Sequence, residues 1–159
     1  MGIRKILTDK EPALHKVCKK VEKFDWRLHK LLDDMKETLL EANGVGLAAP
    51  QVGILRRVVI VDVGGEEMLE LINPELIETD GEQEGPEGCL SVPGRYGLVK
   101  RPYYAKVRAQ DRFGEWFEAE GEELIGRCFC HELDHLDGIL YTEVMERFLT
   151  EEELEADED

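Results

Sequence analysis

Residues 124–138 are LIGRCFCHELDHLDG, and this stretch determines how the rest of the chain is interpreted. Its apolar residues recur at the three- and four-residue spacing of one helix face, and Gly138 is typical of a helix end. The stretch therefore predicts a helix with one buried face. That face consists of Leu124, Ile125, Cys128, Phe129, Leu133 and Leu136.

The same helix carries an HExxH motif from His131 to His135. Two histidines four residues apart lie on the same face of a helix, one turn apart, so both reach one metal ion. Glu132 stands beside that face, where it is placed to hold a water on the metal and take its proton. Because a bound metal lowers the pKa of water toward neutrality, the motif predicts a metal-dependent hydrolase.

The third metal ligand is not fixed by this helix. A catalytic metal normally takes three protein ligands and leaves one position open. A glutamate is one option, although Glu143 and Glu146 follow very soon after the helix end. A third histidine, as in HExxHxxGxxH, is lost because Tyr141 stands at that position. A thiolate is the remaining option, and Cys89 lies in a tight loop segment, but a buried structural thiol is an equal interpretation of it.

Residues 44–53, GVGLAAPQVG, form a second unusual segment. Its glycines and alanines allow another chain to approach the backbone closely, and Pro50 argues against a helix. Gln51 is its single side chain with polar donors, and an amide there is able to donate a hydrogen bond to an oxyanion. A plain structural loop between a helix and a strand is the alternative.

Another helix is predicted upstream of this segment. Asp25 is a helix-capping residue type, and Asn43-Gly44 ends the pattern. A turn or helix start is also expected at Glu11-Pro12. Between Asp25 and Asn43, apolar residues recur at helical spacing and are expected in the core. They are Leu28, Leu31, Leu32, Met35, Leu39 and Leu40.

Short strands and turns are predicted between the two helices. Asn73-Pro74 is expected to break the chain between strands, and the polar, glycine-rich residues 80–88 are expected to form a loop. The expected strands are 57–63, 68–72, 75–79, 103–110 and 115–120, with hairpin turns at Gly64-Gly65 and at 111–114. The order predicts an α+β fold: short antiparallel strands and hairpins packed around a C-terminal metal-binding helix, with an N-terminal helix.

Length and composition fit one globular domain of 159 residues, 42% hydrophobic and 35% charged. We expect a catalytic domain at residues 1–148 and an acidic, flexible tail at 149–159, because blocks of like charge repel themselves. The formal net charge of −16 argues against binding bare nucleic acid. Without a long apolar run or a signal peptide pattern, the protein is expected to be cytoplasmic, with its four cysteines as thiols.

Three segments together resemble the signatures of peptide deformylases, GxGxAAxQ, EGCLS and HExDH. They occur here in that order at residues 44–51, 87–91 and 131–135, and the similarity extends from Ile3 to about Val144. The resemblance implies that Cys89, His131 and His135 hold one divalent metal. It also implies Fe(II) in cells, with zinc, nickel or cobalt able to occupy the same site.

The resemblance further implies the reaction, which is hydrolytic removal of the formyl group from the N-terminal formylmethionine of newly made polypeptides, with release of formate. A metal-bound water is expected to attack the formyl carbon, with Glu132 as general base and then general acid. The Gln51 amide and the backbone N–H of Leu90 are expected to hold the oxyanion. A thiolate ligand predicts that oxygen inactivates the Fe(II) enzyme through Cys89.

The substrate peptide is expected to lie extended along the segments that contain Val45, Gly46 and Gly88. By the same resemblance, Val45, Leu124 and Cys128 line an apolar pocket for the methionine side chain. The expected partner is the nascent formylmethionyl polypeptide, with transient ribosome association and with neither bare nucleic acid nor a membrane as partner. Some family members dock on the ribosome through a basic C-terminal helix, whereas this chain ends in an acidic tail.

Further expectations concern residues around the site. Arg127 and Tyr96 are expected at the rim of the methionine pocket. Arg101 and Asp134 are either a supporting ion pair or unrelated surface charges. Cys130 stands where many family members have glutamine, which is expected to alter hydrogen bonding behind the ligands without removing a ligand.

Two other classes of function stay open from the residues alone. A metalloprotease would cleave internal peptide bonds and use a carboxylate or a histidine as its third ligand. A binding protein that kept the fold and lost activity would be favoured by the loss of Glu132 or Gln51, and both are present.

Overall fold

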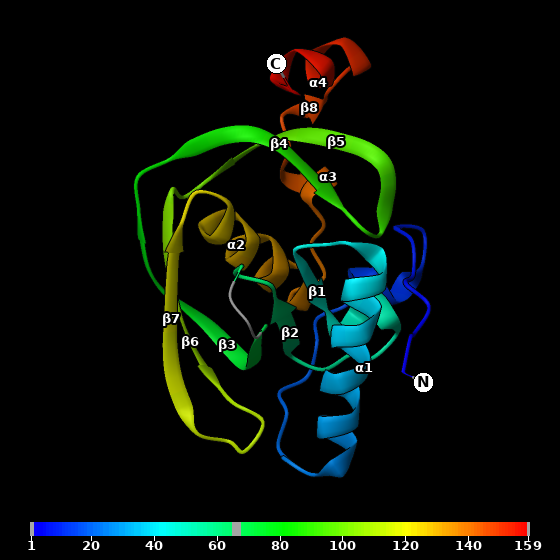
Figure 1. The fold of residues 1–159 in the computed structure, drawn as a ribbon, viewed down its shortest axis with the longest axis vertical. Helices are drawn as coiled ribbons and strands as arrows, with labels where there is room; N and C mark the ends of the chain where they lie inside the picture. The colour runs from blue at the N-terminus through cyan, green and yellow to red at the C-terminus, as the bar shows by residue number, and fades with distance from the viewer. Residues whose placement is uncertain (1, 65–67, 159) are drawn as a thin grey trace.

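The computed structural model describes residues 2–64 and 68–158 as two antiparallel sheets and packed helices (Figure 1). A five-stranded sheet has the order β1-β2-β3-β6-β7, and a three-stranded sheet has the order β4-β5-β8. The helices are α1 (Trp26–Ala42), α2 (Leu124–Leu136), α3 (Tyr141–Val144) and α4 (Glu151–Glu158), and the 3-10 turns are η1 (Pro12–His15) and η2 (Ala49–Val52). The strands are β1 (Gly46–Ala48), β2 (Val58–Val61), β3 (Leu69–Asp80), β4 (Gln83–Cys89), β5 (Val92–Arg101), β6 (Tyr104–Gln110), β7 (Trp116–Glu122) and β8 (Arg147–Phe148). The predicted fold class is confirmed.

Helix α2 lies at the centre of the molecule, with β6 and β7 on one side, β4 and β5 above it and α1 on the other side in the view of Figure 1. Its buried Phe129 and Leu136 share a core cluster with Val59 and Val107 of the five-stranded sheet. The predicted buried face is wrong at Leu124, which is 57% exposed because it is the first residue of the helix and stands at the edge of a cleft.

Helix α1 begins and ends where the sequence predicts. The Asp25 side chain accepts hydrogen bonds from the backbone N–H groups of Arg27 and Leu28. At the other end, Asn43 has a φ of 56°, the left-handed conformation that stops a helix. The predicted apolar face packs on β2 except at Leu40, which is 63% exposed and was wrongly expected in the core.

Strand β3 passes through Asn73-Pro74, so the predicted break is wrong. Asn73 has a φ of 52°, and the register with β6 shifts between Ile72 and Glu75. The Asn73 side chain accepts a hydrogen bond from the Val21 backbone N–H and donates one to the Val21 carbonyl. These contacts hold a β-bulge, which bends the strand without ending it.

Strand β4 replaces the loop predicted at residues 80–88. It pairs antiparallel with β5 from Gln83 opposite Arg101 to Glu87 opposite Gly97. The polar residues and Pro86 are typical of a loop, so the sequence pattern did not predict this strand. They are tolerated because β4 is an edge of the three-stranded sheet, where charged residues and proline are common.

The glycine-rich segment 44–53 contains β1 and the turn η2, so the expectation of no helical structure is wrong at residues 49–52. Pro50 is accepted because it stands in the first turn, where its missing N–H is not needed. The hairpin of β6 and β7 is confirmed. Strands β2 and β3 also pair as predicted, while Gly65 of the predicted Gly64-Gly65 turn lies outside the described residues.

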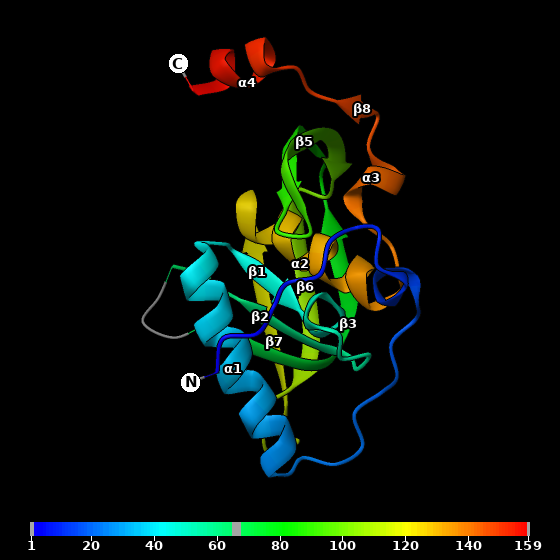
Figure 2. The same ribbon diagram turned by 90° about the vertical axis from the view of Figure 1, so that its right-hand side faces the viewer.

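The acidic tail, which the sequence predicts to be flexible, contains helix α4. Figure 2 shows α4 beyond β8, at the end of the molecule away from the start of α1. The helix is capped by Thr150, whose hydroxyl accepts from the Glu153 N–H, while the Glu153 carboxylate accepts from the Thr150 N–H. The flexibility of residues 149–159 and the domain boundary at 148 stay predictions.

All four cysteines are free thiols, as predicted. None of the helices in the described part of the chain has the length and apolar character needed to cross a membrane.

Candidate metal centre

Cys89, His131 and His135 each bring one ligand atom to within 4.8 Å of the others. Cys89 ends β4, and the two histidines lie one turn apart on α2. Cys89 Sγ lies 3.3 Å from His135 Nε2, and the two imidazole ring centres are 4.9 Å apart. Among the described residues, the cluster around the histidines therefore contains Cys89 and neither Glu143 nor Glu146.

The chemistry of the cluster fits one divalent cation. Glu132 Oε1 and His135 Nδ1 are buried and have no hydrogen-bond partner among the residues that the structure describes. Burial and the neighbouring His131 lower the pKa of His135 well below its usual value, so this imidazole is neutral and able to bind a cation. One thiol and two imidazoles form a donor set suited to iron, zinc, nickel or cobalt.

The carboxyl of Glu132 lies in the same buried surroundings. Burial raises its pKa to about 7, and the neighbouring side chains of His131 and Arg101 offset only part of that rise. A carboxyl group with a pKa near neutrality exchanges protons readily at physiological pH. Its position next to the histidine pair is the one that the HExxH motif predicts.

Glu87 orients His131 from behind. The Nδ1 atom of His131 lies 2.6 Å from Glu87 Oε2, which leaves Nε2 for a ligand. Glu87 also accepts hydrogen bonds from Arg101 Nη2 at 2.7 Å and from Arg127 Nη1 at 2.9 Å. Burial alone would raise the pKa of Glu87, but the hydrogen bonds from His131 and Arg101 hold it far below its usual value. The carboxylate is therefore ionised.

Arg101 also donates to Asp134 Oδ2 at 2.7 Å, so the ion pair is present and the alternative of unrelated surface charges is wrong. Arg127 lines the cleft as expected, yet it is buried and bonded to Glu87. No role was predicted for Glu87 from the sequence. A general rule could have prompted a search for it, because a histidine that binds metal usually has a hydrogen-bond partner, often a carboxylate, on its other ring nitrogen.

Gln51 is held in one orientation. The Ala48 backbone N–H donates to Gln51 Oε1 at 2.9 Å. The amide nitrogen Nε2 therefore faces β4 and β5, where it donates to Ser91 Oγ at 3.1 Å and lies 3.6 Å from Cys89 Sγ. Gln51 is 1% exposed, so few other partners compete for this donor. Ser91, which anchors the amide, was not singled out from the sequence.

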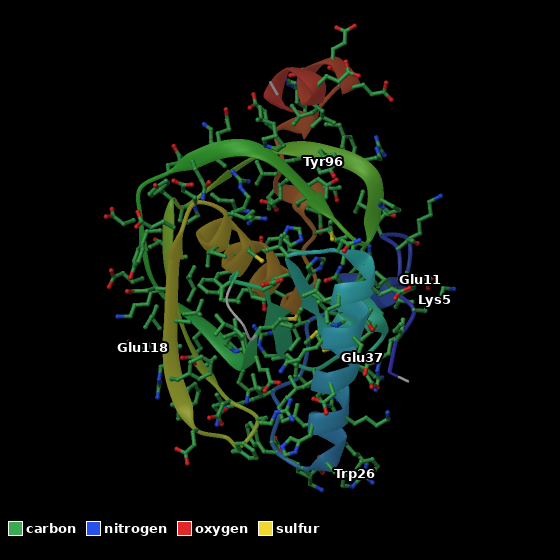
Figure 3. All side chains as sticks on the ribbon, in the orientation of Figure 1. Lys5, Glu11, Trp26, Glu37, Tyr96 and Glu118 are labelled. Carbon is green, nitrogen blue, oxygen red and sulfur yellow. The ribbon has the colours of Figure 1, made fainter. Side chains whose placement is uncertain are left out.

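A cleft of about 530 Å³ opens beside the cluster. Tyr96, labelled in Figure 3, lies on β5 above α2 and contributes to its wall. His135 lies behind the cleft and is fully buried. The other predicted site residues all line it: Val45, Gly46, Gln51, Gly88, Cys89, Leu90, Leu124, Cys128, His131 and Glu132.

Two glycines allow the segments beside this cleft to approach each other. A Cβ atom on Gly46 would lie 2.6 Å from Glu132 Oε2 and 2.8 Å from Cys128 Sγ. A Cβ atom on Gly88 would lie 2.6 Å from the ring of Tyr96. These distances are shorter than van der Waals contact, so both positions need glycine to keep the present geometry.

Comparisons with known proteins agree on one family. Residues 3–150 match the family model described as polypeptide deformylase. A peptide deformylase of Caldicellulosiruptor bescii is 55% identical over 155 residues, which are 98% of this chain and 93% of that protein. A peptide deformylase of Agathobacter rectalis is 57% identical over 146 residues, 92% of each chain.

A solved structure agrees with these relatives. The crystal structure of a peptide deformylase from Legionella pneumophila matches with a TM-score of 0.88 at 44% identity, over 91% of this chain and 86% of that one. Sequence similarity, fold and the arrangement of the cluster all agree, and this chain belongs to the polypeptide deformylase family.

Proposed function

We propose how this deformylase removes the formyl group from the N-terminal formylmethionine of a nascent polypeptide. Cys89, His131 and His135 hold one divalent cation, and the close approach of their ligand atoms is the observation that carries the proposal. The bound cation supplies a Lewis acid, which polarises the formyl carbonyl and makes water more acidic.

Glu132 acts as the general base and then as the general acid. Its buried carboxyl group lines the cleft, and Oε1 has no competing partner among the described residues. Glu132 takes the proton from the water that attacks the formyl carbon. It then gives this proton to the methionine nitrogen as the C–N bond breaks, so formate and a free amino terminus leave.

Gln51 and the backbone N–H of Leu90 stabilise the oxyanion that forms during attack. Because Ala48 holds Gln51 Oε1, the amide presents its Nε2 donor toward Cys89 and Ser91. Leu90 stands between those two residues and lines the same cleft. Donors that are already in place stabilise developing charge at no cost of reorientation.

The substrate lies along the segments of Val45, Gly46 and Gly88, and its methionine side chain occupies the part of the cleft lined by Val45, Leu124 and Cys128. An extended peptide is able to add to exposed strand edges through its backbone. The apolar side chains and the thiol of this wall suit an unbranched apolar side chain better than a charged one.

Fe(II) is the native cation in this proposal, with zinc, nickel or cobalt able to replace it, as the sequence resemblance implies. The enzyme works in the cytoplasm and contacts the ribosome transiently, because its substrates are formylated chains under synthesis.

Product analysis on short peptides tests the reaction. Formyl-Met-Ala-Ser should release formate and leave Met-Ala-Ser intact, whereas acetyl-Met-Ala-Ser and formyl-Asp-Ala-Ser should react much more slowly. Cleavage of an internal peptide bond without formate release would support a metalloprotease and overturn the proposal.

Metal analysis tests the third ligand. Protein purified without oxygen should hold about one cation per chain, as catalytic sites of three protein ligands do. Cys89→Ser should lower that stoichiometry strongly, while Cys130→Ser, which also removes a thiol near the site, should leave it unchanged. Full metal content in Cys89→Ser would show that another residue is the third ligand.

A further inference from the structure

Basic charge is concentrated at the beginning of this strongly acidic chain. Residues 1–30 contain nine of the 20 Lys and Arg residues and four of the 36 Asp and Glu residues, a net charge of +5. The remaining residues, 31–159, carry −21. Figures 1 and 2 place the acidic helix α4 and the start of α1 at opposite ends of the molecule. The net charge of −16 therefore does not describe the surface at the start of α1.

A second cleft, of about 860 Å³, lies at the start of α1, away from the metal centre. Apolar side chains, among them Val21, Leu28 and Ile54, form part of its lining. Two acidic residues, Glu22 and Asp25, also line it. Six basic side chains outnumber these two, and we name this surface the basic cleft after them: Arg4, Lys19, Lys20, Lys23, Arg27 and Arg56.

Most of the cations in the basic cleft are available to a partner. Lys19, Lys20, Lys23 and Arg56 are exposed, and none of them forms an ion pair with any residue in the described part of the chain. Arg27 has only a long contact, 3.7 Å, with Asp25. Unpaired cations gathered in a concave surface raise the local concentration of anions.

The walls of the basic cleft are fixed relative to each other. Lys19 and Arg56 pair through a parallel β-bridge. The Lys19 N–H donates to the Leu55 carbonyl at 3.1 Å, and the Arg57 N–H donates to the Lys19 carbonyl at 3.0 Å. A partner therefore meets cations that are already held side by side by the backbone.

An exposed aromatic ring stands beside one of these cations, Arg27. Trp26, the first residue of α1, is 65% exposed, and Figure 3 shows it at the end of the molecule opposite Tyr96 of the substrate cleft. The Arg27 guanidinium lies 4.9 Å from the centre of its ring. Cations that follow a backbone of phosphates, together with an aromatic ring on which a base stacks, are the combination that binds single-stranded nucleic acid.

We propose that the basic cleft binds the sugar–phosphate backbone of RNA, with Trp26 stacked on an exposed base. The proposal deepens the ribosome contact proposed above and rests on it for the source of the RNA. An acidic peptide could form ion pairs with the lysines, but it has no base to stack on Trp26. Because residues 31–159 carry a net charge of −21, the contact with RNA is expected at the basic cleft. The substrate cleft is lined by other residues and stays open to a nascent chain.

Binding of the metal-loaded, full-length protein to a fluorescent 20-nucleotide single-stranded RNA of mixed sequence tests the proposal. The triple variant Lys19→Ala, Lys20→Ala, Lys23→Ala should bind at least tenfold more weakly. A plot of log affinity against log salt concentration should have a slope that is shallower by roughly 2 for this variant. Each phosphate contact on a single strand contributes about 0.7 to the slope, and three lysines are removed. The matched control Lys5→Ala, Lys10→Ala, Lys100→Ala removes the same charge from exposed lysines outside the cleft and should bind like wild type.

Trp26→Leu separates RNA from other polyanions. This variant should lose affinity for the RNA but keep wild-type affinity for inorganic polyphosphate, which has no bases. An equal loss of RNA affinity in the control and cleft variants would overturn the proposal. So would an acidic peptide of equal charge that binds wild type as tightly as the RNA does.

Deformylation of formyl-Met-Ala-Ser by the same preparations reports on the proposed function separately. All these variants should deformylate the short peptide at the wild-type rate, because their changes lie outside the substrate cleft. Loss of RNA binding with normal deformylation supports the basic cleft as a docking surface. Loss of deformylation in wild type itself would contradict the proposed function, whatever the RNA result.

Discussion

Glu87 connects more side chains around the metal centre than its place in the sequence suggests. It is a buried carboxylate that accepts hydrogen bonds from Arg101, Arg127 and His131. Its negative charge pairs with both guanidinium groups and fixes the ring nitrogen through which His131 faces the cluster. The carboxylate thus acts through His131, which is the role of a positioning residue.

Glu87→Gln should weaken metal binding by about 10- to 100-fold, the usual cost of losing the partner behind a metal-bound histidine. It should also lower the melting temperature, because Arg101 and Arg127 lose their buried counter-charge. Chelator competition and thermal denaturation measure the two effects. Asp134→Asn removes another partner of Arg101 but keeps the contact between Glu87 and His131. Equal loss of metal affinity in both variants would contradict this role.

Among the elements, β1 and α2 must approach closely for the site to form. Gly46 of β1 lies against Glu132 and Cys128 of α2, and its missing side chain is what permits that contact. The strand brings the predicted substrate-binding residues beside the helix that carries the histidines. The cleft is therefore shaped by one close contact between a strand and a helix.

Gly46→Ala should lower kcat/KM roughly 100-fold, since a shift of about 1 Å at reacting groups costs that much. The expected cause is displacement of Glu132, so metal content should stay near the wild-type level. Gly85→Ala is the matched control, because its Cβ atom would meet only Arg127 Nη2, at 3.7 Å. Steady-state kinetics on a formylated peptide would argue against this account if both variants were equally active.

The elements that were predicted correctly are those whose signals are local. Helix α1 has its cap at Asp25 and its stop at Asn43, and the β6–β7 hairpin has its turn between two alternating strands. Strand β4 was missed because only pairing with β5 makes a strand of so polar a segment. The bulge at Asn73 was taken for a break because its partner, Val21, is distant in sequence.

In the candidate site, too, local signals were predicted and contacts between residues distant in sequence were not. Local spacing predicted the histidine pair and Glu132, and the residues alone offered Cys89 and Gln51 as candidates. The resemblance to a family chose Cys89 as the third ligand and added Leu90. The contacts of Glu87 with Arg101 and Arg127 join a strand, its neighbour and a helix. No periodicity in the sequence encodes which charged residues meet after folding, so this network needed the structure.

At the scale of the whole molecule, Cys18 ties the N-terminal segment to the end of α2. Its N–H donates to the Leu136 carbonyl at 2.8 Å, and its side chain lies in the core beside the central sheet. Burial raises the pKa of the Cys18 thiol from its ordinary value of 9.0 to about 11. The folded protein therefore keeps this proton at a pH where the unfolded chain releases it.

Global stability should fall as the pH rises from about 9 to 11. Below that range the thiol is neutral in both states, so it adds no pH dependence. Within the range only the unfolded thiol ionises, which favours unfolding. Urea denaturation across pH 8–10.5 should show that Cys18→Ala releases about one proton fewer on unfolding than wild type. An unchanged pH slope in the variant would mean that Cys18 is not the group responsible.

Formate release by Glu132→Gln tests whether Glu132 activates water beside a cation held by Cys89, His131 and His135. Wild type and variant, both purified without oxygen and both shown to be metal-loaded, are compared on formyl-Met-Ala-Ser. We expect rapid formate release by wild type and a rate about 10²–10⁴-fold lower in the variant, the usual contribution of a general base. Metal-loaded wild type that releases no formate would contradict the proposed reaction, and a variant that releases it at the wild-type rate would show that Glu132 is not the general base.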